Sequence, residues 1–112
     1  MTHGDLVNIC LMHVSPMGLC WGNSTGAGYI VHKLSGGRWS VPRWLSWGFE
    51  GSPDILACIK GRFVGIECKV KYDKIRKPQG RFRKVFEKNG GIYIETRSVD
   101  DIDARLKVEG LL

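Results

Sequence analysis

The sequence predicts one mixed α/β domain over residues 1–112, with a mixed central sheet flanked by helices. Helical patterns open and close the chain, and short apolar segments of strand type fill most of the part between them. A chain of 112 residues has room for one core, and 43% hydrophobic with 25% charged residues is typical of a globular protein. The predicted order is helix, four strands, helix, strand, helix.

The first half of the chain opens with a helix. Thr2 and Asp5 have the spacing of a capping box, and Ser15-Pro16 ends the helical pattern. Because this helix is apolar on nearly all sides, we expect it to be buried. The elements predicted here are a helix over 5–14, strands over 19–21 and 29–34, a turn-rich link over 22–28 and an irregular segment over 36–53.

The second half has the clearer signals. Pro78 is typical of a first helical turn, Gly90-Gly91 of a helix end, and Ser98 with Asp101 of a second capping box. The elements predicted here are strands over 55–59 and 63–70, a helix over 78–88, a strand over 92–94 and a helix that ends before Gly110.

The turn at Lys60-Gly61 allows a geometric prediction. A two-residue turn there pairs the strands so that Asp54 lies opposite Glu67, and Cys58 opposite Phe63. Lys69 shares the face of Glu67, because side chains two apart on a strand point the same way. Since the rest of this hairpin is almost all apolar, its charges need pairing or a metal.

Two carboxylates beside a lysine suit a hard divalent cation such as Mg²⁺, which prefers oxygen ligands. Asp54, Glu67 and the backbone carbonyl of Cys68 are the candidate ligands, and Lys69 would orient or deprotonate a metal-bound water. The alternative is a structural ion pair between Lys69 and either acid. A glycosidase is disfavoured, because directly opposed carboxylates lie closer than two that flank a sugar bond.

Basic residues concentrate in residues 60–88, named here the basic segment. Eleven Lys and Arg against three acids place a net charge of +8 in 29 residues, whereas the whole chain carries +6. Such a segment is either a solvated face or a surface that binds a polyanion. If that polyanion is DNA, as the family resemblance described below implies, the residues expected to contact it are Ser52, Lys71, Lys74, Arg76, Lys77, Arg81 and Arg83.

Several of these residues also form a family pattern. Residues 48–54 (GFEGSPD), residues 66–69 (IECK), Gln79 followed by Phe82, and Gly90-Gly91 resemble the VRR-NUC branch of the PD-(D/E)xK nucleases. The resemblance is strong over residues 48–106. It implies a restriction-endonuclease-like core, an active site with Mg²⁺ or Mn²⁺ as cofactor, metal ligands at Asp54 and Glu67, a catalytic Lys69, and a Gln79 that reaches the site from the following helix.

The resemblance also carries expectations about partners. Small stand-alone members, typical of bacteriophages, resemble homodimeric Holliday junction resolvases, and larger relatives carry the domain within a repair nuclease. The family places a further acid on its first helix, for which Asp5 is the nearest candidate ligand here, although Asp5 also fits a cap for Thr2. The turn that contains Asn23 either corresponds to a polar loop near the family's active site or is a glycine-rich turn.

Aromatic and basic side chains alternate in residues 38–49, which include Trp39, Trp44 and Trp47. They would stack on unpaired bases, pack against a partner subunit or cover the small core. His3, His13 and His32 are interpreted as structural. The four cysteines, Cys10, Cys20, Cys58 and Cys68, have no zinc-ligand spacing and are expected to be reduced, unpaired, buried thiols.

The sequence therefore predicts a metal-dependent, structure-specific DNA endonuclease that acts on branched DNA as a homodimer, with the N-terminal helix at the subunit interface. The alternatives are a non-catalytic DNA-binding module on the same fold and a nuclease with sequence preference. The N-terminus lacks a secretory signal, and no apolar stretch approaches membrane-spanning length. We therefore expect an intracellular protein in the cytoplasm of a bacterial or phage-infected cell.

Overall fold

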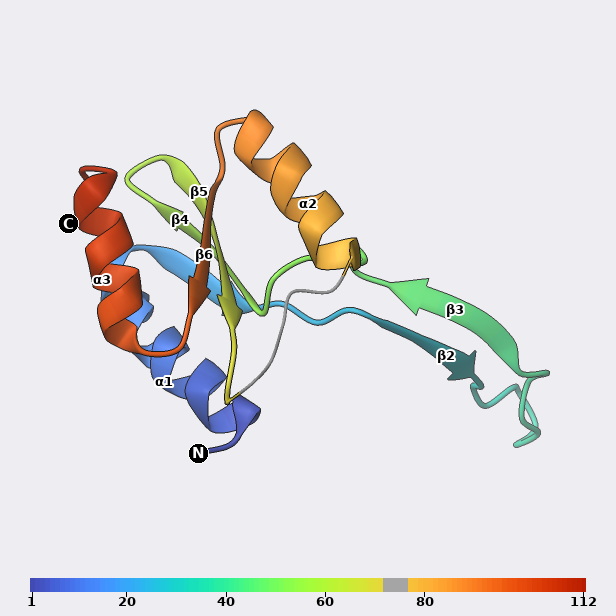
Figure 1. Cartoon of the computed structure of the whole chain (residues 1–112). Coiled ribbons are helices and arrows are strands. Elements are labelled where there is room, and N and C mark those ends of the chain that lie inside the picture. Colours follow the sequence, from blue (N-terminus) through green and yellow to red (C-terminus); the bar gives the residue numbers. More distant parts are fainter. Residues whose placement is uncertain (72–76) are drawn as a thin grey trace.

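The computed structural model describes residues 1–71 and 77–112, with only the backbone at residues 77 and 78. Its main sheet has four strands in the order β1 (Leu19–Gly22), β4 (Ile55–Ile59), β5 (Arg62–Cys68) and β6 (Ile92–Thr96). The β1–β4 and β4–β5 pairs are antiparallel and the β5–β6 pair is parallel, so the sheet is mixed (Figure 1). The predicted mixed α/β architecture is confirmed at this level.

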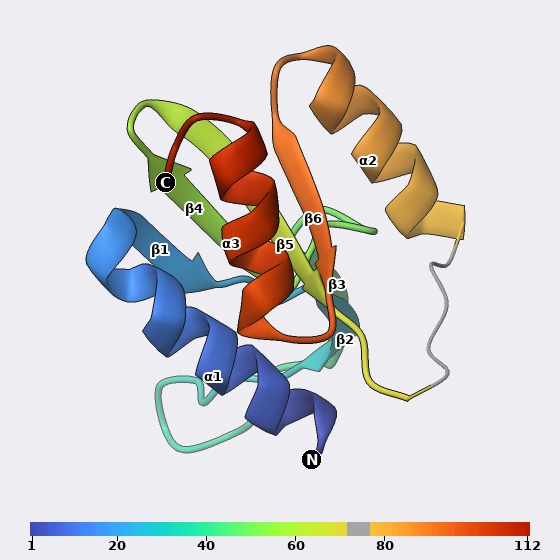
Figure 2. The same ribbon diagram turned by 60° about the vertical axis from the view of Figure 1, so that its left-hand side comes forward.

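Helices lie on both faces of this sheet. α1 (His3–Val14), which continues into a short 3₁₀ turn η1 (Ser15–Met17), packs on one face beside α3 (Val99–Val108), and α2 (Lys77–Lys88) covers the other (Figure 2). Alternate residues of β5 supply the two faces. Val64, Ile66 and Cys68 join the core with α1 and α3, whereas the Phe63 ring contacts Phe86 of α2.

The β4–β5 hairpin has the predicted register. Ile55 lies opposite Ile66 and Cys58 opposite Phe63. Lys60 and Gly61 both have positive φ, 49° and 80°, as a tight turn compatible with the strand twist requires. Asp54, one residue before Ile55, is thereby brought level with Glu67.

The two predicted helix caps differ in outcome. At α1 the capping box is confirmed, because Asp5 N–H donates to Thr2 Oγ1 at 3.1 Å and Thr2 N–H to Asp5 Oδ2 at 3.0 Å. At α3 the prediction is wrong, because Ser98 is the N-cap but its side chain makes no capping bond. Asp101 instead reaches past it and accepts from Arg97 N–H at 2.8 Å.

The expectation that α1 is buried on nearly all sides is also wrong. Leu6, Cys10 and Val14 are buried, but Ile9 and Met12 on the other side are 42% and 76% exposed. The physical reason is that the helix lies on a sheet with α3 as its only helical neighbour among the described residues, and two neighbours cover one side of a helix.

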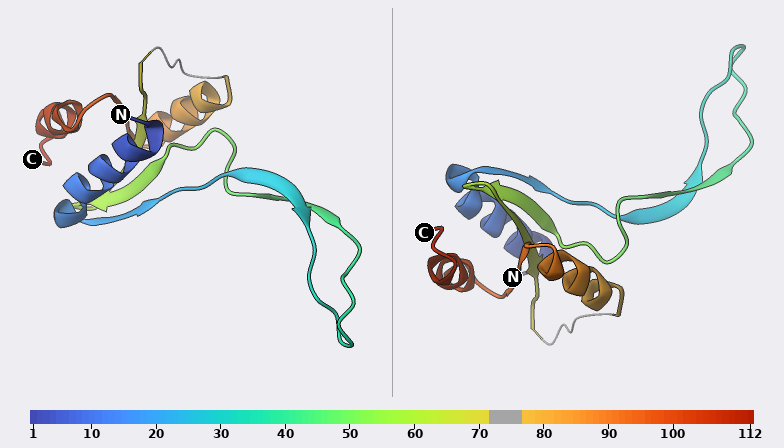
Figure 3. Two further views of the ribbon diagram at one scale, coloured as in Figure 1. Left: turned by 90° about the horizontal axis from the view of Figure 1, so that it is seen from below. Right: turned by 90° about the horizontal axis from the view of Figure 1, so that it is seen from above.

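The largest departure from prediction is a two-stranded arm. β2 (Gly26–Ile30) pairs with β3 (Arg43–Trp47), although a strand was expected over 29–34 and irregular structure over 36–53. Residues 26–49, named here the arm, extend away from the main sheet (Figures 1 and 3). The Cα radius of gyration is therefore 17.0 Å, compared with about 13 Å for a compact chain of this length.

Smaller expectations concern thiols and membranes. All four cysteines are free, as predicted, and Cys10 and Cys68 are buried. The expected burial is wrong for Cys58, which is exposed, and for Cys20, which is half-buried, because neighbouring residues of a strand face opposite sides of the sheet. Among the described residues, no helix combines the length and the apolar character needed to cross a bilayer.

Candidate active site

Several predicted site residues line one cavity of about 540 Å³ at the end of the main sheet, named here the site cavity. β5 leaves the sheet at this end, and the segment before β4 enters it. The lining residues are His3, Asn23, Ser24, Thr25, Ser52, Asp54, Glu67, Cys68, Lys69 and Gln79.

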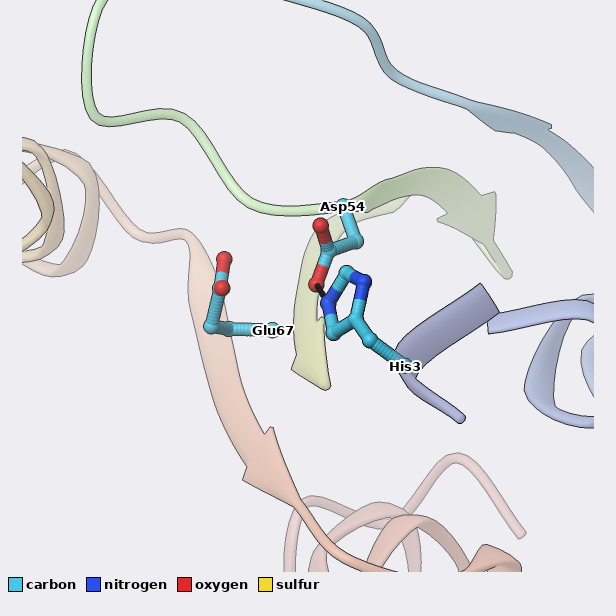
Figure 4. Close-up of side chains that lie close together, drawn as sticks. All are labelled: His3, Asp54 and Glu67. Atoms are coloured by element: carbon cyan, nitrogen blue, oxygen red, sulfur yellow. Dashed lines mark hydrogen bonds and ion pairs between the residues drawn. The ribbon is translucent and has the colours of Figure 1, made fainter. Parts of the chain in front are cut away.

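Asp54 makes the hydrogen bonds on one side of the cavity. Its Oδ2 accepts from the backbone N–H of Cys68 at 2.9 Å and lies 3.1 Å from Nε2 of His3. The side chains of His3, from α1, and Asp54, from the segment before β4, face each other, and the Glu67 carboxylate, from β5, lies to one side of them (Figure 4). One ligand atom from each of the three lies within 4.8 Å of the other two.

A buried chain of polar groups forms the other side. Gln79, from the first turns of α2, donates from Nε2 to Glu67 Oε1 at 2.8 Å and accepts on Oε1 from Lys69 Nζ at 3.0 Å. Lys69 Nζ also lies 3.5 Å from Glu67 Oε1, so the ion pair considered as the alternative is present. None of the three residues is more than 5% exposed. Gln79 therefore fixes the carboxylate and the ammonium relative to each other.

The electrostatics of Glu67 are unfavourable in the chain alone. Burial, followed by the negative charge of Asp54, raises the pKa of Glu67 to about 7. Its Oε2 is buried and has no hydrogen-bond partner in the part of the chain that the structure describes. A buried carboxylate oxygen without a partner costs free energy, and a divalent cation between Glu67 and Asp54 would remove that cost.

Tyr93 of β6 provides a second unpartnered polar atom near this charge. Its hydroxyl is buried and has no hydrogen-bond partner among the described residues. Burial, with the charge of Glu67 as the next cause, raises the pKa of this phenol above its ordinary range. The guanidinium of Arg83 lies 5.1 Å above the Tyr93 ring. Tyr93 therefore stays neutral behind the site.

Asn23 holds the loop that carries Asp54. Its side-chain Nδ2 donates to Ser52 Oγ at 2.6 Å and to the carbonyl of Pro53 at 2.9 Å, and its backbone N–H donates to the carbonyl of Asp54 at 2.7 Å. Of the two interpretations of this turn, a polar loop at the site therefore describes it better than a glycine-rich turn alone. An asparagine between glycines just before a strand was the available signal.

We expect Asn23→Ala to destabilise the fold by about 1–3 kcal/mol, because Ser52 and the Pro53 carbonyl lose their donor and the Asp54 loop its support. The matched control is Asn89→Ala, which also removes an amide bond to a backbone carbonyl (2.8 Å to Val85) but lies at the far end of α2. The melting temperatures of both variants check this. An equal loss of stability in both would contradict a specific role of Asn23 in holding the Asp54 loop.

His3 lies at the site, and Asp5 takes the capping role, one of the two roles expected of it. His3, interpreted as structural from the sequence, faces Asp54 and lines the site cavity. The Asp5 carboxylate is engaged in the capping box, and Asp5 is not among the residues that line the cavity. Sequence reasoning missed His3 because 51 positions separate it from Asp54 and no local spacing relates the two.

The residues expected to contact DNA are described only in part. Ser52 lines the site cavity. Lys71 and Arg81 are exposed, and each follows by two residues a residue that lines the cavity, Lys69 or Gln79. Arg83 is half-buried, and its Nε lies 2.6 Å from Glu87 Oε1 one helical turn away. Lys74 and Arg76 lie outside the described residues, as does the side chain of Lys77.

The donors present fit a divalent cation. Asp54 and Glu67 offer the oxygen ligands that Mg²⁺ and Mn²⁺ take, and the His3 imidazole is a ligand that Mn²⁺ accepts more readily than Mg²⁺. The unpartnered Oε2 of Glu67 is the observation that favours a cation here. Compared with known proteins, the chain matches no family model and no curated protein.

Proposed function

We propose that this protein is a metal-dependent, structure-specific DNA endonuclease with a restriction-endonuclease-like core of the PD-(D/E)xK type. The observation that carries the proposal is the meeting of Asp54, Glu67, Lys69 and Gln79 in one cavity, with a buried Glu67 oxygen that lacks a partner among the described residues. A purely structural ion pair between Lys69 and Glu67 uses Oε1 and gives no reason for the nearby Asp54 or for the unpartnered Oε2.

Each residue has a chemical role in this proposal. Asp54 and Glu67 would hold Mg²⁺ or Mn²⁺, with the Cys68 carbonyl as a further oxygen, and the cation would supply charge stabilisation at the phosphate and acidify a water. Lys69 orients the attacking water and faces the negative charge that develops on the phosphate. Gln79 keeps the Lys69 ammonium and the Glu67 carboxylate in register. Asn23 and His3 position Asp54.

The basic segment supports DNA as the substrate. Lys71, just after β5, and Arg81, in α2, are both exposed. Each lies two residues along the chain from a residue of the site, Lys69 or Gln79. Contacts with phosphates recognise the shape of a duplex more than its sequence, which fits branched DNA such as a Holliday junction.

The test of the proposal is a cleavage panel with purified protein and Mg²⁺ or Mn²⁺. The substrates are linear duplex, flap, single strand and four-way junction, each with a random sequence. Cleavage of the junction at symmetric positions is the expected result. Binding without cleavage under either metal would identify a non-catalytic DNA-binding module, and cuts at one recurring sequence in linear duplex would identify a nuclease with sequence preference.

Salt dependence tests the role of the basic segment. We expect Lys71→Gln combined with Arg81→Gln to flatten the slope of log affinity for duplex DNA against log salt by about two units, because each neutralised phosphate contributes about −0.9. The control is Lys107→Gln in α3, an exposed lysine outside the segment. An unchanged slope in the double variant would make Lys71 and Arg81 part of a solvated face.

A homodimer is part of the proposal. A twofold dimer would present two equivalent sites for paired cuts on a four-way junction. The exposed side of α1, with Ile9 and Met12, is the surface we assign to it. Sedimentation equilibrium should give twice the monomer mass of 12.6 kDa, and Ile9→Glu with Met12→Glu should give the monomer. Val108→Glu, at a still more exposed position of α3, is the control. A wild-type protein that stays monomeric with and without junction DNA would exclude the dimer.

A further inference from the structure

The arm exposes more apolar surface than its own two strands cover. An isolated two-stranded sheet is marginally stable in water, so an arm of this kind needs a partner that covers it. Its most exposed large apolar side chains, each more than 60% exposed, are Tyr29, Trp39, Val41, Trp44 and Phe49.

The charge of the arm indicates what the partner is. No Asp or Glu occurs from Leu6 to Phe49, whereas the arm itself carries Lys33, Arg38 and Arg43. Two arms of like charge would repel each other, so the arm is a poor surface for pairing with its own copy. Cations alternating with exposed aromatic rings are instead the composition that binds single-stranded nucleic acid.

One ring of the arm covers the glycine positions of β2, close along the chain to a residue that lines the site cavity. A Cβ atom added at Gly26 would come within 2.7 Å of the Trp47 six-membered ring, and one at Gly28 would lie 3.8 Å from it. The indole therefore rests on backbone that has no side chains, and 45% of Trp47 is still exposed. Gly26 pairs with Trp47 across the β2–β3 ribbon and directly follows Thr25, which lines the site cavity.

Further aromatic groups continue along the arm away from the cavity. Tyr29 and Trp44 are opposed on the other face of the ribbon, with ring centroids 5.1 Å apart and planes at 73°. Beyond the strands, Lys33 Nζ lies 5.8 Å from the Trp39 ring. The views from above and below show the arm leaving the body beside the segment that enters β4 (Figure 3).

We propose that the arm binds unpaired nucleotides of the DNA substrate, with a base stacked on Trp47 and phosphates held by Arg43 and Arg38. The location beside the scissile phosphate rests on the proposed nuclease function, whereas the binding itself does not. In a branched substrate that carries a single strand, such as a flap, the unpaired nucleotides beside the branch point would occupy the arm while the flanking duplex meets the basic segment. The arm would thus make a branch with unpaired nucleotides preferred over continuous duplex.

The test measures binding of a ten-residue oligo-dT strand in EDTA, where no cleavage occurs. The full chain with Trp21→Phe reports only the arm, because the other three of its four tryptophans are Trp39, Trp44 and Trp47. We expect the strand to quench this emission, and Trp47→Leu to raise the dissociation constant roughly tenfold or more. Affinity for continuous duplex should be unchanged.

A pair of glycine substitutions tests the geometry of Trp47 without removing any aromatic ring. Gly26→Ala should push the indole off the ribbon and weaken oligo-dT binding about as much as Trp47→Leu, whereas Gly28→Ala should leave it unchanged, since its new methyl group meets the ring at ordinary contact distance. Circular dichroism confirms that both variants fold. Equal affinity in the two glycine variants and the parent would overturn the proposal.

Three further outcomes separate this proposal from the alternatives. If Trp47→Leu converts a dimer into a monomer and leaves oligo-dT affinity unchanged, the arm is a subunit interface and the proposal is wrong. If the protein cleaves a junction but the oligo-dT strand causes no quenching, the arm proposal fails and the nuclease stands. If quenching is seen without cleavage under any metal, the nuclease fails and the arm still binds unpaired DNA.

Discussion

Replacement of Asp54 by Asn, or of Lys69 by Ala, is expected to reduce DNA cleavage by roughly three orders of magnitude or more. Asp54 would hold the cation and Lys69 faces the reacting phosphate, and each such contribution is worth several kcal/mol in the transition state. A factor of ten in rate corresponds to about 1.4 kcal/mol. Single-turnover cleavage of a four-way junction in Mg²⁺ and Mn²⁺ provides the measurement.

Binding separates this chemical loss from a loss of substrate. In EDTA both variants should bind junction DNA nearly as well as the parent, because the proposed affinity would come from many phosphate contacts outside the site cavity. Asp100→Asn, an exposed acid in the first turn of α3, removes one negative charge away from the cavity and should keep full activity. Full activity of the Asp54 or the Lys69 variant would show that the residue replaced takes no part in the reaction.

Glu67→Gln should change the pH dependence of stability in the metal-free protein. Burial raises the pKa of Glu67 from its usual 4.5 to about 7 in the fold. The native state is therefore favoured while Glu67 is protonated, and this stability is lost as the pH rises through about 7. At about 1.4 kcal/mol per pKa unit, the loss approaches roughly 3 kcal/mol at pH 8.

The variant removes the titration but keeps the hydrogen bonding. The amide introduced by Glu67→Gln can still accept from Gln79 Nε2, and Lys69 keeps its bond to Gln79 Oε1. In EDTA we expect the variant to melt above the parent at pH 8 and close to it at pH 5. Mg²⁺ or Mn²⁺ should stabilise the parent at pH 8 and have little effect on the variant. If the melting temperatures of the two proteins change with pH in the same way, the ionisation of Glu67 does not cause the loss of stability.

The β4–β5 hairpin shows how far local rules reach. The turn at Lys60-Gly61 sets the register, and the twofold alternation of a strand then puts Glu67 and Lys69 on one face, level with Asp54. These relations involve neighbouring segments only, so they could be derived without knowing the rest of the fold. Gln79 was anticipated only through the family resemblance, because its contact depends on where α2 docks.

Residues brought in from distant segments were harder to foresee. His3 and Asn23 reach the Asp54 loop from α1 and from the link before β2, and neither shows a spacing relative to Asp54 in the chain. Ser98 failed as a side-chain cap because Asp101 bonds to the Arg97 backbone instead. Each of these outcomes depends on which of several polar partners the folded backbone brings within bonding distance.

By itself, the sequence determined the mixed α/β class, the hairpin register and the convergence of two carboxylates with a lysine, because turn conformation and strand alternation act over a few residues. The tertiary structure alone decided that residues 26–49 form an arm with exposed tryptophans instead of a cover for the core. Hydrophobicity is the same whether a ring faces a core or a partner. Which of these it faces depends on the long-range pairing of β2 with β3, and no local pattern in the chain encodes that pairing.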